Sequence, residues 1–418
     1  MFLNLWKKEC AQVGKSLIYW LYVVILAVFF VSQMGSMKET MIGKPEKGQE
    51  NYMSYGTKKS DDEKDIMEAA LGNLAWGIYY EHFETYPVGF AKSVSLSEKE
   101  WTELYDILMD TTGLSKETVG ADIEEHFKEH DPMTNYMAYV TEAKEGLTYE
   151  EFLKNMERVA DILGPGSDFT EERMKASVEL PMDYEGAVEA YENLIKEDGY
   201  TGGYLRLFCD YMGIILGILP VFVVATRILR DKRAQMQELV FTRRISSVTL
   251  VAGRYIAMVT MMMVPVILLS LAPMFDCMSF TKGSGIRLDY LAFFKYDFGW
   301  LLPSVMIVTA VGFLITELTE SALSVLVQGV WWFASLQIGV NGMRGGQYGW
   351  NLIPRHNTEL NYVGFADGFG QLLLNRALYA GVAVLLVAVT VWIYEKKRKG
   401  YLRRNGKILR NRKRTAQA

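Results

Sequence analysis

Long blocks of apolar residues dominate the pattern of this chain, and they predict helices that span a membrane. Residues 17–31 and 378–393 contain no charged side chain, whereas a strand in a soluble core needs only about four to eight apolar residues. A helix that crosses roughly 30 Å of hydrocarbon needs about 20 residues. We therefore predict six transmembrane helices, at residues 16–34, 207–229, 256–275, 299–315, 322–340 and 372–394.

The segment 35–203, between the first two predicted spans, changes to charged, amphipathic stretches. Ser97 with Glu100, and Thr148 with Glu151, have the spacing of capping boxes, which begin helices. After an irregular neck at residues 35–60, we predict helices at residues 62–86, 98–110, 116–130, 149–163 and 183–196. The pattern indicates a folded, mostly helical domain inserted between the first and second spans.

Two local patterns refine the membrane region. Residues 1–15 carry apolar side chains at helical spacing among lysines, which predicts an amphipathic helix in the head-group layer. A simple lead-in to the first span fits the same residues equally well. The second predicted span contains Gly213 and Gly217 at a spacing that permits close helix approach, and Pro220, whose missing N–H permits a kink.

The net charge of −5 conceals an acidic inserted domain and a basic C-terminal tail at residues 395–418. The inserted domain holds about 37 Asp and Glu against about 16 Lys and Arg, which produces a negative field around it. Such a field would attract a cationic peptide substrate. A solvated acidic surface without a ligand is the more ordinary interpretation.

Lysine and arginine in the short flanking segments predict the orientation of the chain. The N-terminus, residues 227–254 and the tail hold about 21 of them, against about 5 in the two short outer loops. The positive-inside rule therefore places both termini in the cytoplasm and residues 35–203 outside. The predicted fold class is an all-α protein of the cell membrane, with six transmembrane helices and a large, mostly helical extracytoplasmic domain between helices 1 and 2.

Most catalytic chemistry has no matching motif in this chain. Its three cysteines are too few and too scattered for a disulfide framework or a thiolate metal site. Gly14, Lys15 and Ser16 resemble the end of a phosphate-binding loop, but Glu9 stands where that loop requires glycine. We expect no nucleotide hydrolysis by this chain and no nucleic-acid partner.

One enzyme-like motif is present, because His126, Glu129 and His130 match the H-x-x-E-H form of inverzincin metallopeptidases. On a helix the two histidines share a face and could bind one Zn²⁺, with Glu129 as the base. A catalytic site also needs a third protein ligand, for which Glu189 and Glu192 are available. Solvated histidines on a charged helix are the plainer interpretation.

Residues 230–254 form a predicted cytoplasmic loop with apolar positions between charges, a pattern that can present a short helix to a partner. The loop resembles that of the ABC-2-type transporter permeases, as does the plan of an amphipathic N-terminal helix, one span, an outer insertion, five clustered spans and a basic tail. Arg254 matches the basic residue that opens the third span in this family. Ala234 and Arg244 depart from it, because they stand where members often have a Gly-Thr pair and a proline.

The resemblance implies partners for this chain. In the family this loop docks on a separate ABC ATPase subunit, so ATP and Mg²⁺ would bind there and this chain would need no cofactor. A second permease copy, or a related permease, would complete the pathway. The implied docking contacts are Gln235, Glu238, Leu239, Phe241 and Arg243. A solvated loop held near anionic membrane lipid by its arginines is the alternative.

Polar residues within the spans are candidates for a transport pathway, because burying them in hydrocarbon is costly. Gln328 and Gln337 could line a path or cross-link helices. Arg376, beside Asn375 near the outer end of the last span, fits anchoring by snorkelling better than substrate binding. The resemblance implies the permease subunit of an ABC exporter for a peptide, lipid or drug. The alternatives are a receptor or sensor with a ligand-binding outer domain, and a zinc metallopeptidase.

Overall fold

The computed structural model describes residues 2–400 except for 36–37, 39–40, 50, 59, 88–91, 130–138, 179, 340–345 and 347. The chain divides into two compact units. The first unit combines Met1–Met41 with Ile195–Ala418, and the second unit is Ile42–Leu194. Residues 35–203, predicted as the inserted domain, contain this second unit.

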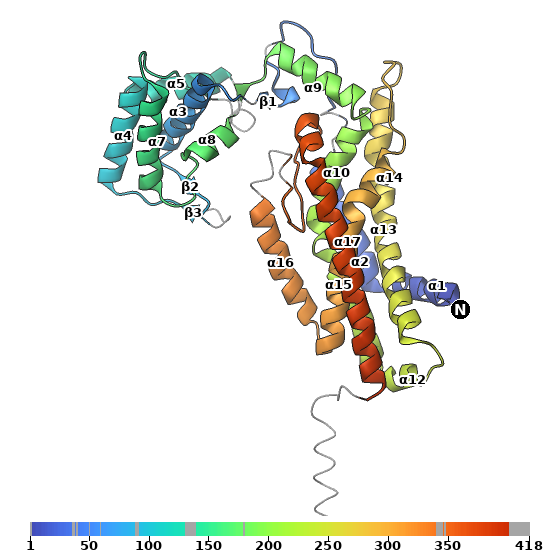
Figure 1. Cartoon of the computed structure of the whole chain (residues 1–418). Helices are drawn as coiled ribbons and strands as arrows, with labels where there is room; N and C mark the ends of the chain where they lie inside the picture. Colours follow the sequence, from blue (N-terminus) through green and yellow to red (C-terminus); the bar gives the residue numbers. More distant parts are fainter. Residues whose placement is uncertain are drawn as a thin grey trace, which may run out of the picture. The chain divides into compact units, whose positions relative to one another are not determined.

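The first unit is a bundle of helices (Figure 1). It consists of α1 (Phe2–Gly14), α2 (Leu17–Met34), α10 (Thr201–Leu216), α11 (Leu219–Arg233), α12 (Gln237–Phe241), α13 (Ser247–Phe280), α14 (Ala292–Tyr296), the π-helix η3 (Asp297–Leu301), α15 (Leu302–Thr319), α16 (Leu323–Gly339) and α17 (Tyr362–Arg398). Helix α15 contacts α11, α13, α16 and α17, so it lies at the centre of the bundle. The apolar window of Ala292–Thr319 is 61% buried, against 22% for Leu17–Met34, which leaves most of α2 facing outward.

Most of the predicted spans coincide with helices that are long and apolar enough to cross a membrane, and one coincides with a shorter helix. Four described helices are long and apolar enough to cross a membrane, namely Leu17–Met34, Ser247–Phe280, Ala292–Thr319 and Tyr362–Arg398. A fifth is formed if the pair Thr201–Leu216 and Pro220–Arg233, bent by 42°, is one span. The remaining predicted span, at residues 322–340, falls on α16, which has only 17 residues. The total of six therefore stays a prediction.

The kink predicted in the second span is confirmed. Helix α10 ends at Leu216, and Pro220 occupies the first turn of α11, where a missing N–H costs no helix bond. A Cβ at Gly217 would lie 3.0 Å from both Ile353 and Trp332, so the backbone approaches its neighbours closely there. At Gly213 the nearest atoms would be 3.9 Å away, so the close approach is realised only at Gly217.

Helix α1 is also confirmed as a helix. Figure 1 shows it running roughly across the direction of the long helices. It contacts α13 and α2, and its Val13 side chain is buried. A helix in this position suits the predicted location in the head-group layer. That location stays a prediction, because the structure contains no membrane.

The second unit is mostly helical, as predicted. Its elements are the 3-10 helix η1 (Met53–Tyr55), β1 (Thr57–Lys58), α3 (Glu63–Tyr79), β2 (Glu84–Thr85), β3 (Lys92–Ser93), α4 (Glu98–Thr112), α5 (Lys116–Glu129), α7 (Tyr149–Leu163), α8 (Glu171–Ser177), β4 (Leu180–Pro181) and α9 (Tyr184–Lys196). The helix predicted at residues 62–86 ends earlier, at Tyr79, because the chain turns at Glu81, which has a φ of 49°. Strands β1 and β4 pair antiparallel, as do β2 and β3.

Helix caps and an apolar core hold the second unit together. Both predicted capping boxes are present: the hydroxyls of Ser97 and Thr148 accept the N–H of Glu100 and Glu151, whose carboxylates accept the N–H of the capping residue. Behind these caps, α3, α4, α5 and α7 bury an apolar core. Each of these four helices contributes at least one fully buried member, for example Leu74, Leu104, Ile123 and Phe152.

Candidate functional site

A buried network of charges joins α1 to α11 and α13 at one end of the first unit. Glu9 of α1 is only 6% exposed, and its carboxylate accepts hydrogen bonds from Arg227 of α11 and Arg254 of α13. Arg254 also donates to Asp231 over 2.6 Å, and Arg227 donates to Asp231 over 3.4 Å. Two arginines therefore balance two carboxylates, which makes burial of Glu9 tolerable. Arg254, the predicted opening residue of the third span, is what ties α13 into this network.

The short helix α12 and the loop after it are held by the end of α17. The Arg398 guanidinium donates to three backbone carbonyls, those of Phe241 at 3.0 Å, Arg243 at 2.9 Å and Ile245 at 2.6 Å. The ring of Phe241 lies edge-on to that of Tyr394, with centroids 5.5 Å apart. A displacement of this loop must therefore either move the end of α17 or break these contacts.

A second set of ion pairs joins α11, the turn after α15 and α17 at the same end of the unit. Lys232 lies 3.0 Å from the Glu320 carboxylate, and Lys397 lies 3.2 Å from it. Lys397 is also 3.3 Å from Glu317. Although partial burial disfavours the charge of Glu320, the two lysines hold the pKa of its carboxyl below its ordinary value. The ends of α11, α15 and α17 are thus linked to one another by ion pairs.

The predicted docking residues divide into exposed and partly covered side chains. Leu239 is 53% exposed, and the side chains of Gln235 and Arg243 are also exposed. Phe241 is only half-buried, because Tyr394 covers one side of its ring. The side chain of Glu238 lies outside the described part of the chain. An exposed leucine on a surface helix is compatible with docking, which stays a prediction.

Two of the predicted pathway residues have defined partners in the protein. Gln328 of α16 is fully buried and donates over 2.6 Å to the carbonyl of Gly217, at the break between α10 and α11. It therefore cross-links two helices, which is one of the two uses predicted for it. Arg376 is only 3% exposed, so the predicted snorkelling to water is wrong. Gln337 is half-buried, and its role stays a prediction.

Arg376 is enclosed by acceptors within the protein instead. Its guanidinium donates to the hydroxyl of Ser304, the amide oxygen of Asn375 and the carbonyls of Trp300, Asn351 and Leu352. The Trp300 carbonyl belongs to the π-helix η3, and those of Asn351 and Leu352 belong to the segment before α17, so one side chain holds both segments. The hydrogen-bond donors of a charged side chain near a helix end can be satisfied either by water or by backbone carbonyls. The sequence does not distinguish these two environments.

Two further buried ion pairs were missed by the sequence patterns. Arg206 lies 2.8 Å from Asp198, and also donates to the carbonyl of Leu360. Arg355 donates to the Asp210 carboxylate over 3.0 Å. Asp210 lies inside the predicted second span, and a carboxylate inside a span is itself a signal that a cation must be nearby.

The proposed zinc motif is only partly within the described residues. His126 is half-buried, and its ring lies edge-on to Tyr139 with centroids 5.5 Å apart. His130 and the side chain of Glu129 lie outside the described residues, so the pairing of the two histidines is untested. Within the described residues, no group of three His, Cys, Asp or Glu side chains could hold a metal ion.

A helical bundle with four or five apolar helices of spanning length defines the chain as a polytopic membrane protein. A family model described as ABC-2 family transporter protein matches residues 50–345, and the chain belongs to this family. The predicted resemblance is thereby confirmed, and an ABC ATPase is the general partner that membership implies. The matched range includes most of the second unit, so the family model covers this unit as well as part of the first. No curated protein and no solved structure matches the chain.

Proposed function

We propose that this chain is the permease subunit of an ABC exporter, and that α12 with its loop receives movement from a separate ATPase subunit. Both termini and α12 lie in the cytoplasm in this proposal, as the distribution of Lys and Arg favours. ATP and Mg²⁺ bind to the ATPase subunit. Two permease chains form the pathway, and peptides, lipids and drugs are the substrate classes to test.

The observation that carries the proposal is the set of three hydrogen bonds from Arg398 to backbone carbonyls of α12 and the loop after it. A coupling element must both contact the partner and be tied to the spans that move. Exposed Leu239 supplies the first property. The three carbonyls that accept hydrogen bonds from Arg398 supply the second property, because they connect the loop to the last residue of α17.

Docking is tested by co-purification of the full-length chain with its ATPase subunit. Leu239→Ala removes the most exposed apolar side chain of α12, and we expect recovery of the ATPase subunit to fall about tenfold or more, as it does when a hot-spot residue of an interface is truncated. Leu291→Ala is the matched control, because Leu291 is 64% exposed but follows α13 at the other end of that helix. Failure to recover any ATPase subunit, or equal recovery by the two variants, would contradict docking through α12.

Coupling is tested separately from docking with Arg398→Ala. This variant loses the three hydrogen bonds to the loop but keeps Leu239, so we expect normal recovery of the ATPase with reduced stimulation of its ATP turnover. Lys399→Ala is the matched control, since Lys399 is exposed and pairs only with Glu395 of its own helix among the described residues. Stimulation that is unchanged in Arg398→Ala would show that α17 does not take part.

A further inference from the structure

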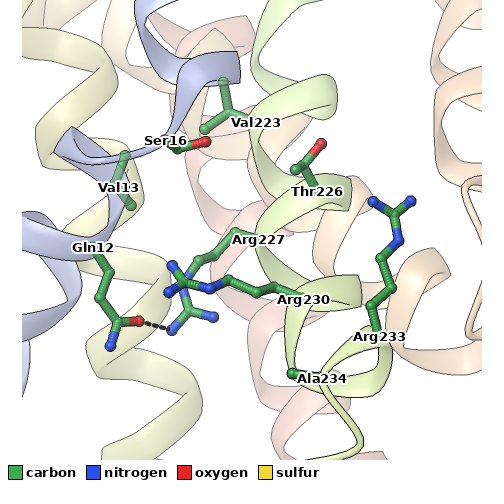
Figure 2. A pocket seen from close by; sticks show the side chains of 9 residues that line it. All are labelled: Gln12, Val13, Ser16, Val223, Thr226, Arg227, Arg230, Arg233 and Ala234. Carbon is green, nitrogen blue, oxygen red and sulfur yellow. Dashed lines mark hydrogen bonds between the residues drawn. The ribbon is translucent and has the colours of Figure 1, made fainter.

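A pocket of about 260 Å³ lies between α1 and α11, at the end of the first unit where α2 begins. Figure 2 shows its lining, which consists of Gln12, Val13, Ser16, Val223, Thr226, Arg227, Arg230, Arg233 and Ala234. Ser16 immediately precedes α2, and Arg233 is the last residue of α11. The pocket is therefore level with the start of the apolar helix α2 and the basic end of α11, and the ends of membrane-spanning helices are where the phosphates of a bilayer are found.

Three arginines and no acidic side chain line this pocket. Arg227 is already neutralised, because it binds Glu9 and also donates to Gln12 over 2.7 Å. The guanidinium groups of Arg230 and Arg233 are exposed and form no ion pair or hydrogen bond within the described residues. Two uncompensated positive charges beside a cavity attract an anion.

The side chains approach the pocket from two sides. In Figure 2 Arg230 extends toward Gln12 and Arg227, whereas Arg233 lies on the other side, beside Thr226. A guanidinium binds phosphate oxygens with two parallel N–H donors, so each of these arginines offers a phosphate in the pocket a bidentate contact. The hydroxyls of Ser16 and Thr226 are further donors along the same lining.

The size and apolar part of the pocket restrict its occupant. Drug-sized ligands usually occupy about 300–1,000 Å³, so a space of 260 Å³ suits a head group better than a complete transported molecule. Val13 and Val223 are buried apolar members of the lining, next to which the first carbons beyond a phosphate would pack. The cytoplasmic leaflet, which the proposed orientation gives to this end, is rich in anionic lipid.

We propose that this pocket binds the phosphate of an anionic compound, supplied either by a lipid head group or by a soluble phosphate. A bound phosphate bridges α1 and α11, the same two helices that Glu9 and Arg227 join. It therefore strengthens the attachment of α1 to the bundle. This binding goes beyond the proposed coupling to an ATPase and does not require it, so either proposal can fail alone.

The test measures lipid binding to the full-length detergent-solubilised chain by native mass spectrometry, with phosphatidylglycerol and phosphatidylcholine as probes. We expect one tightly bound phosphatidylglycerol per native chain, and at least about tenfold weaker binding in R230Q/R233Q, since two charge-assisted contacts are lost. R230K/R233K keeps the charge without the bidentate geometry and should bind with intermediate affinity. The matched control is K7Q/K8Q, which removes the same charge from exposed residues of α1 outside the pocket.

The arms of the experiment identify the source of the phosphate. If inorganic phosphate binds and displaces phosphatidylglycerol in the native chain but not in R230Q/R233Q, the pocket takes a soluble phosphate as well. If only the lipid binds, the head group is the ligand. Equal loss of binding in R230Q/R233Q and K7Q/K8Q would overturn the proposal, because ordinary surface attraction would explain it. Equal affinity for phosphatidylcholine would also overturn it, because that head group has no net charge.

Discussion

The two units of this chain use charge in opposite ways. In the first unit, several ion pairs are buried between segments: the side chains of Arg206 and Asp198, for example, are 0% and 3% exposed. In the second unit, ion pairs lie at the surface: those of Arg158 and Glu103 are 50% and 40% exposed. The unit with so many apolar helices is thus the one in which several arginines, among them Arg206, Arg355 and Arg376, are buried.

The buried arginines compensate for irregular backbone in the first unit. Residues 348–361, between α16 and α17, are not helical, yet many of them are buried. Buried carbonyls outside helices need other donors, especially where water is scarce. Arg206 donates to the carbonyl of Leu360, and Arg376 donates to that of Leu352. Each arginine therefore replaces the hydrogen bonds that a regular helix would have made.

Removing one partner of a buried pair should have the largest effect. Asp198→Ala leaves the Arg206 guanidinium buried without its carboxylate, which typically costs about 3–5 kcal/mol of unfolding free energy. Asp168→Ala is the matched control in the second unit, because its partner Arg173 is 2.8 Å away but the Asp168 side chain is 56% exposed. An exposed pair contributes about 0–1 kcal/mol. Denaturant or thermal unfolding of the full-length chain in detergent compares them, and equal losses would contradict the contrast between the units.

A core substitution in the second unit should have a smaller or similar effect and should stay local. Leu104 of α4 is fully buried, and replacing a core leucine by alanine usually costs about 2–5 kcal/mol. Met109→Ala, on the same helix but with Met109 49% exposed, is the control and should cost little. Hydrogen exchange of the full-length chain should accelerate in α3, α4 and α7 for Leu104→Ala only. Acceleration in α13 or α15 would show that the two units do not unfold separately.

Features that depend on neighbouring residues were predictable from the sequence. The capping boxes at Ser97 and Thr148 need only residues three positions apart, and both are present. Long apolar runs likewise predicted the positions of α2, α13 and α17. Boundaries were less accurate, because charged residues that pair in space extend a helix beyond its apolar run. Helix α17 continues to Arg398, although residues 395–418 were predicted as a tail.

Contacts between distant residues were not predictable in the same way. Asp210 and Arg355 are 145 residues apart, and no local pattern links them. The hydrogen bonds of Arg398 likewise join it to carbonyls of α12 and the loop after it that lie 153 to 157 positions earlier in the chain. The loop itself was identified from its alternation of charge and apolar residues, but its attachment to α17 depends on packing. The sequence therefore predicted which residues of the loop could face a partner, but not the contacts that attach the loop to α17.

The smallest expected effect concerns the caps of the second unit and their dependence on pH. Ser97→Ala removes the cap of α4, which usually costs about 1 kcal/mol, whereas Ser95→Ala, at an exposed position just before it, is the control. Hydrogen bonds from the hydroxyl and N–H of Ser97 lower the pKa of Glu100 from its ordinary 4.5.

The stabilising contribution of Glu100 is therefore complete above the unfolded pKa and is lost as the pH falls through the lower folded pKa. Hydrogen exchange in the first turn of α4, corrected for its intrinsic pH dependence, should accelerate below about pH 4.5 in the native chain and in Ser95→Ala. In Ser97→Ala it should already be faster at neutral pH and should respond less to acid. If acid accelerated the three proteins equally, other carboxylates of this acidic unit, and not the caps, would control its stability.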